Sequence, residues 1–429
     1  MLKETDYWEP EIETMPLEKL RQKQEESLRS LVKRAYHKVT FYRKKFDELK
    51  INPQDINGLE ALTELPLTRY LEDFVVTPLE DKLAVPWESI TEIMTTSGTL
   101  SGFTQPIVMT DNDVEMINSL FGRCVRMAGV GKEDIIQLLG PFDSFLPVLK
   151  KLSSKVIPSI AGRMILDNQI MIAKSVGTSV IFTLPSYLVR LCERARELGI
   201  DLRNDTAIQI ALGAGEPFSI PVKKRIEAEY GIYLYDMYGF SESAIVAGEC
   251  RQRDGLHIWA DHFLSEVIDP ETLRPLSPGE EGELVITTLK KEAMPLIRYR
   301  TGDLTRLLDD KPCGCGRTHP KIAPIRGRVD HIIRIQGTKL LPSDIEDFIV
   351  GTPMLGNEYR IIADRKGELD ILRIKVEQAP GISFTNELRE EVEAGFHQKT
   401  SLRSQIEVVP HGTLQKTQFK AQRIISVHP

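Results

Sequence analysis

Short, mainly apolar runs alternate with longer amphipathic segments through the central part of the chain. The short runs predict buried strands at 134–139, 179–183, 208–212 and 232–235. The longer segments predict helices at 113–128, 187–198 and 220–230. Strands that alternate with helices favour right-handed crossovers and a parallel sheet. We therefore expect an α/β fold, whose large N-terminal domain holds a doubly wound, mostly parallel sheet.

The pattern differs towards both ends of this region. Residues 17–49 have helical spacing, whereas 266–270 and 282–288 alternate as antiparallel strands around a turn at Pro278-Gly279. Beyond Gly327, helices expected at 345–350 and 386–399 are mixed with strands expected at 369–376 and 405–409. We expect an antiparallel β subdomain and a small, mobile α+β C-terminal domain, dividing the chain into domains 1–326 and 327–429.

The composition narrows the class of protein. A chain of 429 residues is long enough for about two or three domains, and 41% hydrophobic with 27% charged residues is typical of a globular protein. A net charge of −7 without a basic block argues against nucleic-acid binding, and no apolar run could span a membrane. Five cysteines and a polar N-terminus favour a reducing compartment, so we expect a cytoplasmic protein.

A run of small hydroxyl residues and glycines follows the extended segment 89–94. It contains Thr96, Ser97, Gly98 and Thr99. Backbone N–H groups and hydroxyls in such a loop form a concave donor surface that suits phosphate oxygens. An ordinary hairpin turn explains the same residues, and the loop lacks the Gly-Lys-Ser/Thr ending of a P-loop.

A second cluster of candidate residues consists of Cys250, His257, Cys313 and Cys315. Thiolates and an imidazole can hold zinc tetrahedrally, and Cys-x-Cys can present two sulfurs to one ion. The spacing is not that of a zinc finger, and free thiols in turns remain the alternative. Cys124 and Cys192 lie in predicted helices and are expected to be core thiols.

Several ordered motifs together resemble the adenylate-forming acyl-CoA synthetases, within them the phenylacetate–CoA ligase branch. The motifs are 238–242 (YGFSE), 254–263 (DGLHIWADHF), 291–300 (KEAMPLIRYR), 299–303 (YRTGD), 313–319 (CGCGRTH) and 327–330 (GRVD). The resemblance implies an ATP-dependent, Mg²⁺-requiring ligase. Such an enzyme adenylates a small, aromatic or similar carboxylic acid and transfers the acyl group to CoA. A structural zinc and a homodimer are implied by the same resemblance.

The resemblance also assigns roles to individual residues. Those matched to ATP or AMP binding are Thr96, Ser97, Gly98, Thr99, Ala214, Gly215, Glu216, Pro217, Asp236, Tyr238, Gly239, Phe240, Ser241, Asp303 and Arg328. Glu242 matches the Mg²⁺-binding acid, and Lys420 matches the catalytic lysine of the C-terminal domain. Asp330 matches the hinge between domains, and Gly337 matches the glycine that the pantetheine arm passes. Phe142, Phe145 and Tyr187 lie where the acyl pocket is built.

Each assignment has a plainer alternative. Glu242 and Asp303 are also ordinary turn residues, Arg328 a surface ion pair and Lys420 an exposed tail lysine. Phe142 and Phe145 are equally explained as core aromatics. The chain departs from the family pattern in four places. Its hydroxyl loop has no lysine, and Phe419 precedes Lys420 in place of glycine. His331 stands where the family often has a second hinge aspartate, and 140–145 replace a glycine-rich segment.

Two other functions fit the same motifs. One is an adenylating enzyme that loads an acyl or aminoacyl group onto a carrier protein or another acceptor. The other is a catalytically degenerate nucleotide-binding protein.

Overall fold

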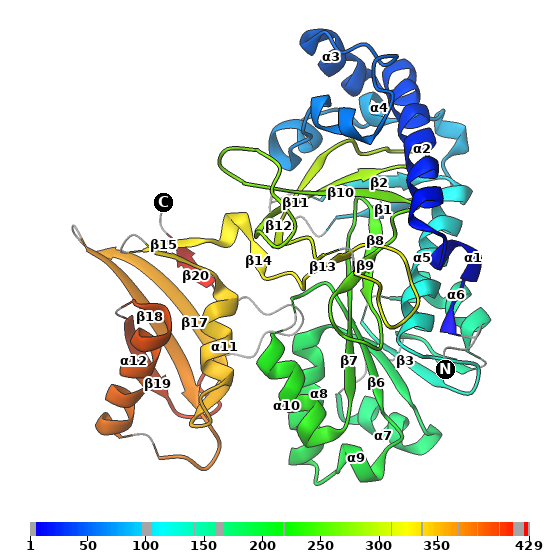
Figure 1. Ribbon diagram of the computed structural model, residues 1–429. Coiled ribbons are helices and arrows are strands. Elements are labelled where there is room, and N and C mark those ends of the chain that lie inside the picture. Colours follow the sequence, from blue (N-terminus) through cyan, green and yellow to red (C-terminus); the bar gives the residue numbers. More distant parts are fainter. Residues whose placement is uncertain are drawn as a thin grey trace.

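The structure, a computed structural model of the chain, describes residues 6–96, 104–140, 142–153, 155–159, 166–217, 219–309, 311–335, 338–366, 369–383, 385–402, 404–414 and 424–427. A mixed β-sheet occupies the centre of the larger body, and a smaller body with its own sheet lies beside it (Figure 1). Within the described residues, no helix is long and apolar enough to cross a membrane.

The central sheet has the strand order β13-β9-β8-β7-β6-β5-β3-β4. Its parallel half contains β3 (Ile135–Leu139), β4 (Lys155–Ile157), β5 (Val180–Thr183), β6 (Ile210–Ala214) and β7 (Tyr233–Phe240). Its antiparallel half adds β8 (Ala244–Glu249), β9 (Leu256–Ile258) and β13 (Lys321–Ile322). Since the carboxyl ends of parallel strands meet at one edge, loops that follow them gather there.

Helices cover both faces of the parallel strands. The helices on one face are α5 (Asp111–Met127) and α6 (Leu146–Leu152). Those on the other are α7 (Leu166–Val176), α8 (Pro185–Glu197), α9 (Leu202–Asp205) and α10 (Ile220–Tyr230). Along β5, Val180 and Phe182 enter the first core while Ile181 enters the second. Because successive side chains point to opposite faces, a strand buried on both sides reads as a continuous apolar run.

A separate antiparallel sheet has the order β10-β11-β12-β14. Its strands are β10 (Phe263–Ile268), β11 (Gly282–Thr288), β12 (Tyr299–Thr305) and β14 (Gly327–Arg328). The N-terminal helices are α1 (Pro10–Glu13), α2 (Leu17–Lys38), α3 (Thr40–Leu49) and α4 (Leu79–Lys82). Buried residues of α2 and α3 share a core with Leu264, Leu289 and Ile297. A two-stranded hairpin, β1 (Glu92–Thr95) with β2 (Pro106–Met109), lies beside these elements.

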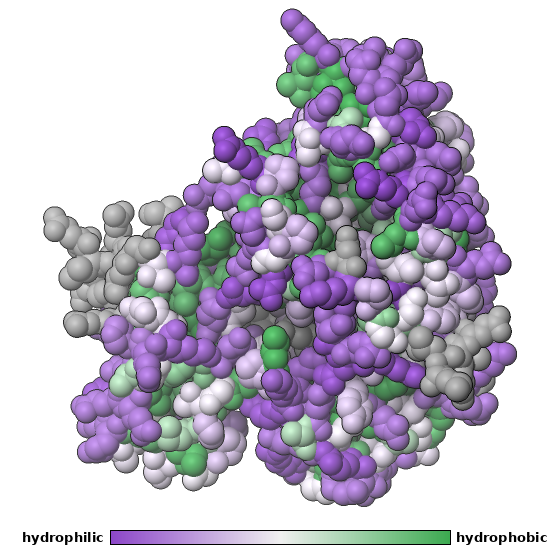
Figure 2. Space-filling view, viewed as in Figure 1, coloured by the Kyte–Doolittle hydropathy of each residue, from purple (hydrophilic) through white to green (hydrophobic). Residues whose placement is uncertain are grey.

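The smaller body follows β14 and has a core of its own. Its sheet has the order β19-β18-β17-β20, with β17 (Leu355–Lys366), β18 (Leu369–Gln378), β19 (Ser404–Val409) and β20 (Ile424–Val427). The hairpin β15 (Ile333–Ile335) and β16 (Thr338–Leu340) and the helices α11 (Pro342–Val350) and α12 (Asn386–Thr400) complete it. The face drawn in Figure 2 is mainly hydrophilic and is indented between this body and the larger one.

The α/β architecture with its antiparallel subdomain and α+β body is as predicted from the sequence. Helix α5 begins earlier than expected, because Thr110 and Asp113 form a capping box there. The antiparallel half of the central sheet was not predicted. A tight turn after β7 reverses the chain at Ser241–Ser243, and Ala244 adopts a left-handed φ of 72°.

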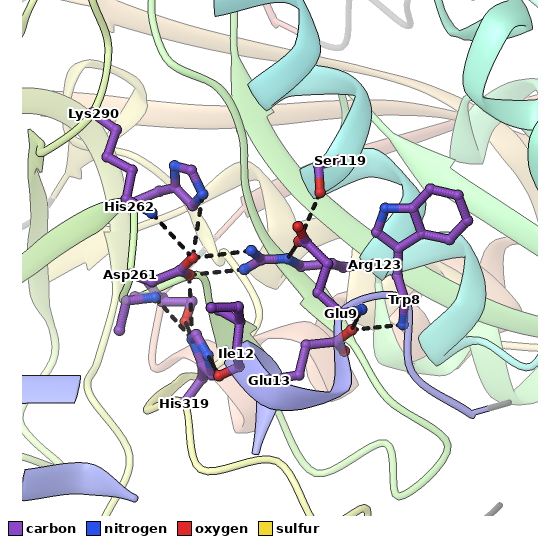
Figure 3. Close-up of polar contacts among 12 residues, drawn as sticks. Trp8, Glu9, Ile12, Glu13, Ser119, Arg123, Asp261, His262, Lys290 and His319 are labelled. Atoms are coloured by element: carbon purple, nitrogen blue, oxygen red, sulfur yellow. Dashed lines mark hydrogen bonds and ion pairs between the residues drawn. The ribbon is translucent and has the colours of Figure 1, made fainter. Parts of the chain in front are cut away.

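A buried ion network connects the N-terminal segment to the core of the larger body (Figure 3). The Arg123 guanidinium donates to both carboxylate oxygens of Asp261, at 2.8 and 2.9 Å, and its Nε donates to Glu9 at 2.6 Å. Burial raises the pKa of Asp261, but hydrogen bonds from His262 and Arg123 outweigh it and hold that pKa below its ordinary value. Arg123 and Asp261 are both almost fully buried, and the two hydrogen bonds between them compensate charges that water does not reach.

We therefore predict that Arg123→Met lowers the free energy of unfolding by about 3–5 kcal/mol, because it leaves Asp261 buried without its main partner. Arg194→Met is the matched control, since Arg194 forms an equally close ion pair with Asp167 at the surface. That variant should cost less than about 1 kcal/mol. Equal losses for the two variants in denaturant titrations would contradict this account.

Candidate functional site

The carboxylate of Asp303 receives hydrogen bonds from two other elements. The Tyr238 hydroxyl at the end of β7 donates to Oδ2 at 2.7 Å, and Arg328 Nη1 on β14 donates to Oδ1 at 3.0 Å. The strand register places Asp303 opposite Arg328. A Cβ at Gly302 would lie 2.5 Å from Arg328 Nη2, so glycine allows the guanidinium to approach. Three predicted site residues thus meet at one point.

Arg328 also connects this point to the start of the smaller body. Its Nε donates to Asp330 at 2.9 Å, and Asp330 lies in a short 3₁₀ helix, η7 (Val329–His331). Arg328 therefore bridges two carboxylates, one on the antiparallel sheet and one at the predicted hinge. Burial lowers the pKa of Arg328, but the charges of Asp303 and Asp330 outweigh it and raise that pKa above its ordinary value. The guanidinium is charged at any physiological pH.

Glu242 lies in the turn between β7 and β8 and is only 7% exposed. Burial raises the pKa of its carboxyl above the ordinary value. Its own backbone N–H, the Lys291 charge and the Tyr299 hydroxyl lower that pKa but do not cancel the effect of burial. Phe240, two residues before it, stacks on Tyr299 with ring centroids 5.5 Å apart. A carboxylate in a buried turn beside Tyr238 is suited to bind a hard cation.

Thr96 closes the stem of the hairpin that carries the hydroxyl loop. Its N–H donates to the Gln105 carbonyl and its hydroxyl accepts from the Gln105 N–H, both at 2.9 Å. Ser97, Gly98 and Thr99 lie outside the described residues, as do Gly337 and Lys420. Their predicted roles therefore stay predictions.

The segment Ala214–Pro217 follows the carboxyl end of β6. Gly215 has a φ of 83°, which glycine adopts readily, and Glu216 accepts a hydrogen bond from the Ser186 N–H at 3.0 Å. Since Ser186 lies in the first turn of α8, the Glu216 carboxylate caps that helix. The cap gives Glu216 a local structural role and places the segment at the sheet edge where β5 and β6 end.

Asp236 pairs with Gly213 on β6 and is almost fully buried. Burial and the neighbouring Glu249 carboxylate raise its pKa to about 7. Lys223 forms an ion pair with Glu249 and partly offsets this effect. Asp236 therefore changes charge near neutral pH.

The three residues expected at the acyl pocket separate into two environments. Phe142 stacks on Phe182 at 3.9 Å between centroids, and Phe145 stacks on Phe121 at 4.0 Å. Both rings thus join the core on the α5 side of the sheet. Tyr187 packs against the other core, and its hydroxyl donates to Gln169 Oε1. Packing against buried aromatic residues accounts for Phe142 and Phe145 without a ligand.

The four predicted metal ligands meet in one buried cluster. The ligand atoms of Cys250, His257, Cys313 and Cys315 all lie within 4.8 Å of one another. The Cys250 and Cys313 sulfurs are 3.7 Å apart, and Cys315 Sγ is 3.3 Å from His257 Nε2. Tetrahedral zinc with ordinary bond lengths requires about 3.8 Å between sulfurs and about 3.5 Å between sulfur and nitrogen. The cluster could hold a metal ion.

His319, which the sequence analysis did not single out, supports this cluster. Its carbonyl accepts from His257 Nδ1 at 2.9 Å, which leaves His257 Nε2 facing the cysteines. The His319 ring contacts the Ile12 carbonyl, and the Tyr7 hydroxyl donates to the Cys315 carbonyl at 2.8 Å. The N-terminal segment thus covers the cluster, and the run Cys313–His319 was the available sequence signal.

Comparisons with known proteins place this chain among the AMP-binding enzymes. The family model described as "AMP-binding enzyme" matches residues 155–289, and the one described as "AMP-binding enzyme C-terminal domain" matches residues 337–427. The second match covers most of the smaller body.

The similar curated proteins narrow the class. A phenylacetate-coenzyme A ligase of Thermus thermophilus is 36% identical over 90% of this chain and 87% of its own length. One of Escherichia coli is 33% identical over 97% of both chains. The chain belongs to the phenylacetate–coenzyme A ligase family, and it is an AMP-forming acid–CoA ligase that works through an adenylate.

Solved structures of a 2-hydroxyisobutyryl-CoA ligase share the fold at 26–27% identity. In the postadenylation state with an acyl-AMP bound, that enzyme gives a TM-score of 0.89 over 99% of this chain and 93% of its own. In the thioesterification state with CoA the TM-score is 0.70, over 98% of this chain and 92% of its own. The two bodies of this chain are therefore arranged more like the postadenylation state.

The raised pKa of Asp236 yields a pH-dependent prediction. Folding favours the protonated carboxyl, so the wild type loses stability relative to Asp236→Asn as pH rises from about 4 to about 7. The stability gain of the variant should grow over this range to at most ~4 kcal/mol, at about 1.4 kcal/mol per pKa unit. Denaturant titrations at pH 5 and pH 8 measure it, and an unchanged difference would contradict the assigned burial.

Proposed function

We propose that this ligase activates a small aromatic carboxylic acid of the phenylacetate type and transfers it to CoA. Relatives at 32–36% identity over most of the chain carry the name phenylacetate-coenzyme A ligase, which supports this substrate class. The observation that supports the proposed nucleotide site is the meeting of Asp303, Tyr238 and Arg328 beside the Glu242 turn.

We propose 1–326 and 327–429 as the two domains.

In the proposed first step, a carboxylate oxygen attacks the α-phosphorus of ATP, and the bond to pyrophosphate breaks. Asp303 accepts hydrogen bonds from the ribose hydroxyls, and the hydroxyl loop at Thr96–Thr99 donates to the phosphates. Ala214–Pro217 flank the base, and Asp236 and Tyr238–Ser241 complete the nucleotide site. Glu242 would hold Mg²⁺, which neutralises phosphate charge. Lys420 brings an ammonium to the attacking carboxylate and the α-phosphate.

In the second step the CoA thiol loses its proton, the sulfur attacks the acyl carbonyl carbon and AMP leaves. We propose that the smaller domain turns about Asp330 between the steps, and that the CoA arm passes Gly337. The different TM-scores against two states of one related ligase support such a rotation. We also propose a homodimer in the cytoplasm, which light scattering and cell fractionation test.

Lys420→Ala should slow pyrophosphate release by ~100-fold or more, because it removes a charge that acts on the transition state. Transfer to CoA from supplied phenylacetyl-AMP should continue, since the second step does not use that ammonium. Unchanged adenylation would refute the role of Lys420. Acyl-AMP formation without free acyl-CoA would indicate a different acceptor.

We further propose that the Cys250, His257, Cys313 and Cys315 cluster holds a structural zinc ion. Four protein ligands would complete the tetrahedral shell, so the ion would serve folding and not the reaction. The covering segment would connect it to the N-terminus through Tyr7, and through the ion pair of Arg317 with Glu13.

Metal analysis should therefore find about one zinc per chain. Chelation should lower the melting temperature and speed proteolysis near Tyr7 and Glu13, because both residues contact the loop that carries Cys313 and Cys315. Cys192→Ser is the control for loss of a thiol: Cys192 is buried in another core, so this variant should still bind metal and respond to chelator as the wild type does. A preparation of full activity that lacks metal, and is unaffected by chelator, would contradict the proposal.

A further inference from the structure

A fully buried lysine lies beneath the turn that carries Glu242. Lys291 is in the connection between β11 and β12 and is 1% exposed. Its ammonium donates a hydrogen bond to the backbone carbonyl of Glu242. The contact is made to the main chain of the turn, so it acts on the backbone from which the Glu242 side chain projects.

The lysine is itself fixed from the opposite side. Arg34 on α2 donates to the carbonyls of Lys291 and Glu292, at 2.6 and 3.4 Å. The Asp113 carboxylate accepts from the N–H groups of Glu292 and Ala293, at 2.7 and 2.9 Å. The Lys291 backbone is thus anchored to α2 and α5 independently of Glu242. It provides a fixed support for the turn.

The turn has little freedom of its own. The Ser243 N–H donates to the Phe240 carbonyl at 3.1 Å, and Ala244 adopts a left-handed φ of 72°. A Cβ at Gly239 would lie 2.1 Å from the Ala244 carbonyl oxygen, so the two strands are in close contact there. Lys291 adds a third constraint on this turn, because its ammonium holds the Glu242 carbonyl.

Packing alone does not explain a lysine at this position. Burying an ammonium is costly, and a neutral donor would satisfy one carbonyl at lower cost. Catalytic groups held in place before the substrate binds need no rearrangement during the reaction, and misplacement of about 1 Å can cost ~100-fold in rate. A charged, rigidly anchored donor behind a proposed metal-binding carboxylate fits that requirement.

We propose that Lys291 is a positioning residue for adenylation, which holds the Glu242 carbonyl and so orients the Glu242 carboxylate before nucleotide binds. This inference rests on the proposed function of Glu242 in the same site. It assigns Lys291 to the first half-reaction, because Glu242 would act on the ATP phosphates and not on CoA.

The test compares Lys291→Met with Arg34→Met. Both variants remove a cation that donates to a backbone carbonyl in this region, but only Lys291 contacts the Glu242 turn. Three quantities are measured: pyrophosphate exchange over a Mg²⁺ titration, acyl transfer from supplied phenylacetyl-AMP to CoA, and amide hydrogen exchange of residues 240–244 without metal or nucleotide.

Lys291→Met should lower the pyrophosphate-exchange rate by ~100-fold, raise the Mg²⁺ concentration required, and speed amide exchange in the turn. Its acyl transfer from supplied phenylacetyl-AMP should stay within about 2-fold of wild type. Arg34→Met removes one anchor of the Lys291 backbone but keeps the ammonium contact with Glu242, so it should speed turn exchange less than Lys291→Met does. Equal effects of the two variants on all three measurements, or normal turn exchange in Lys291→Met, would overturn the proposal.

If Lys291→Met does not fold, the wild type still provides a test. The Ser243 amide should already be protected without metal or nucleotide, and MgATP should change its exchange by less than about 3-fold. Protection that arises only with MgATP would refute preorganisation by Lys291. Failure of the proposed function is distinct: the wild type itself would then form no acyl-AMP from any acid.

Discussion

The structure depends on one constraint at the junction of its two bodies: the Arg328 guanidinium lies between the carboxylates of Asp303 and Asp330. A charged group placed there fixes β14 against β12 and holds the first residues of the connection to the smaller body. The same carboxylate of Asp303 also accepts from Tyr238 at the end of β7. The central sheet, the antiparallel sheet and the connection are thus joined through a few charge-assisted hydrogen bonds, which are among the stronger polar contacts in proteins.

This arrangement explains how one site can serve two reactions. Among the described residues, those proposed to bind nucleotide lie on the larger body, which is stabilised by buried cores and by the Arg123–Asp261 network. The contacts between the bodies include surface ion pairs, such as Arg326 with Asp344 and Lys339 with Glu271. Exposed pairs of this kind contribute little stability, so the smaller body can change position at low cost. Such a change of position is what the proposed rotation between the two half-reactions requires.

The sequence predicted the fold well where pattern and packing agree. Val180, Ile181 and Phe182 alternate between two cores, so their continuous apolar run identified a buried parallel strand. The antiparallel strand β8 was missed because the turn at Ser241–Ser243 has no Asn-Gly or Asp-Gly signal. Strand β9 was missed because its three residues, Leu256–Ile258, are too few to show an alternating pattern. The four residues of the metal cluster were named from the sequence, but only the fold shows their proximity, since His257 and Cys315 are distant in sequence and 3.3 Å apart in space.

The site was predictable in its chemistry but not in its supporting contacts. Asp303, Arg328 and Tyr238 were identified from motif resemblance, and the structure brings them together. Lys291 and His319 lay inside motifs that had been noticed, yet neither was singled out. Lys291 acts on the Glu242 carbonyl, and His319 acts through its own carbonyl, and sequence does not reveal contacts of the main chain. Phe142 and Phe145 were also explained as core aromatics, and their stacking on Phe182 and Phe121 supports that explanation.

The most direct test of the central claim is a crystal structure with a non-hydrolysable phenylacetyl-adenylate analogue. The account predicts ribose hydroxyls within hydrogen-bonding distance of the Asp303 carboxylate, and the phosphate between the Thr96–Thr99 loop and the Glu242 turn. An analogue bound elsewhere, with no contact to the Asp303 carboxylate, would contradict it.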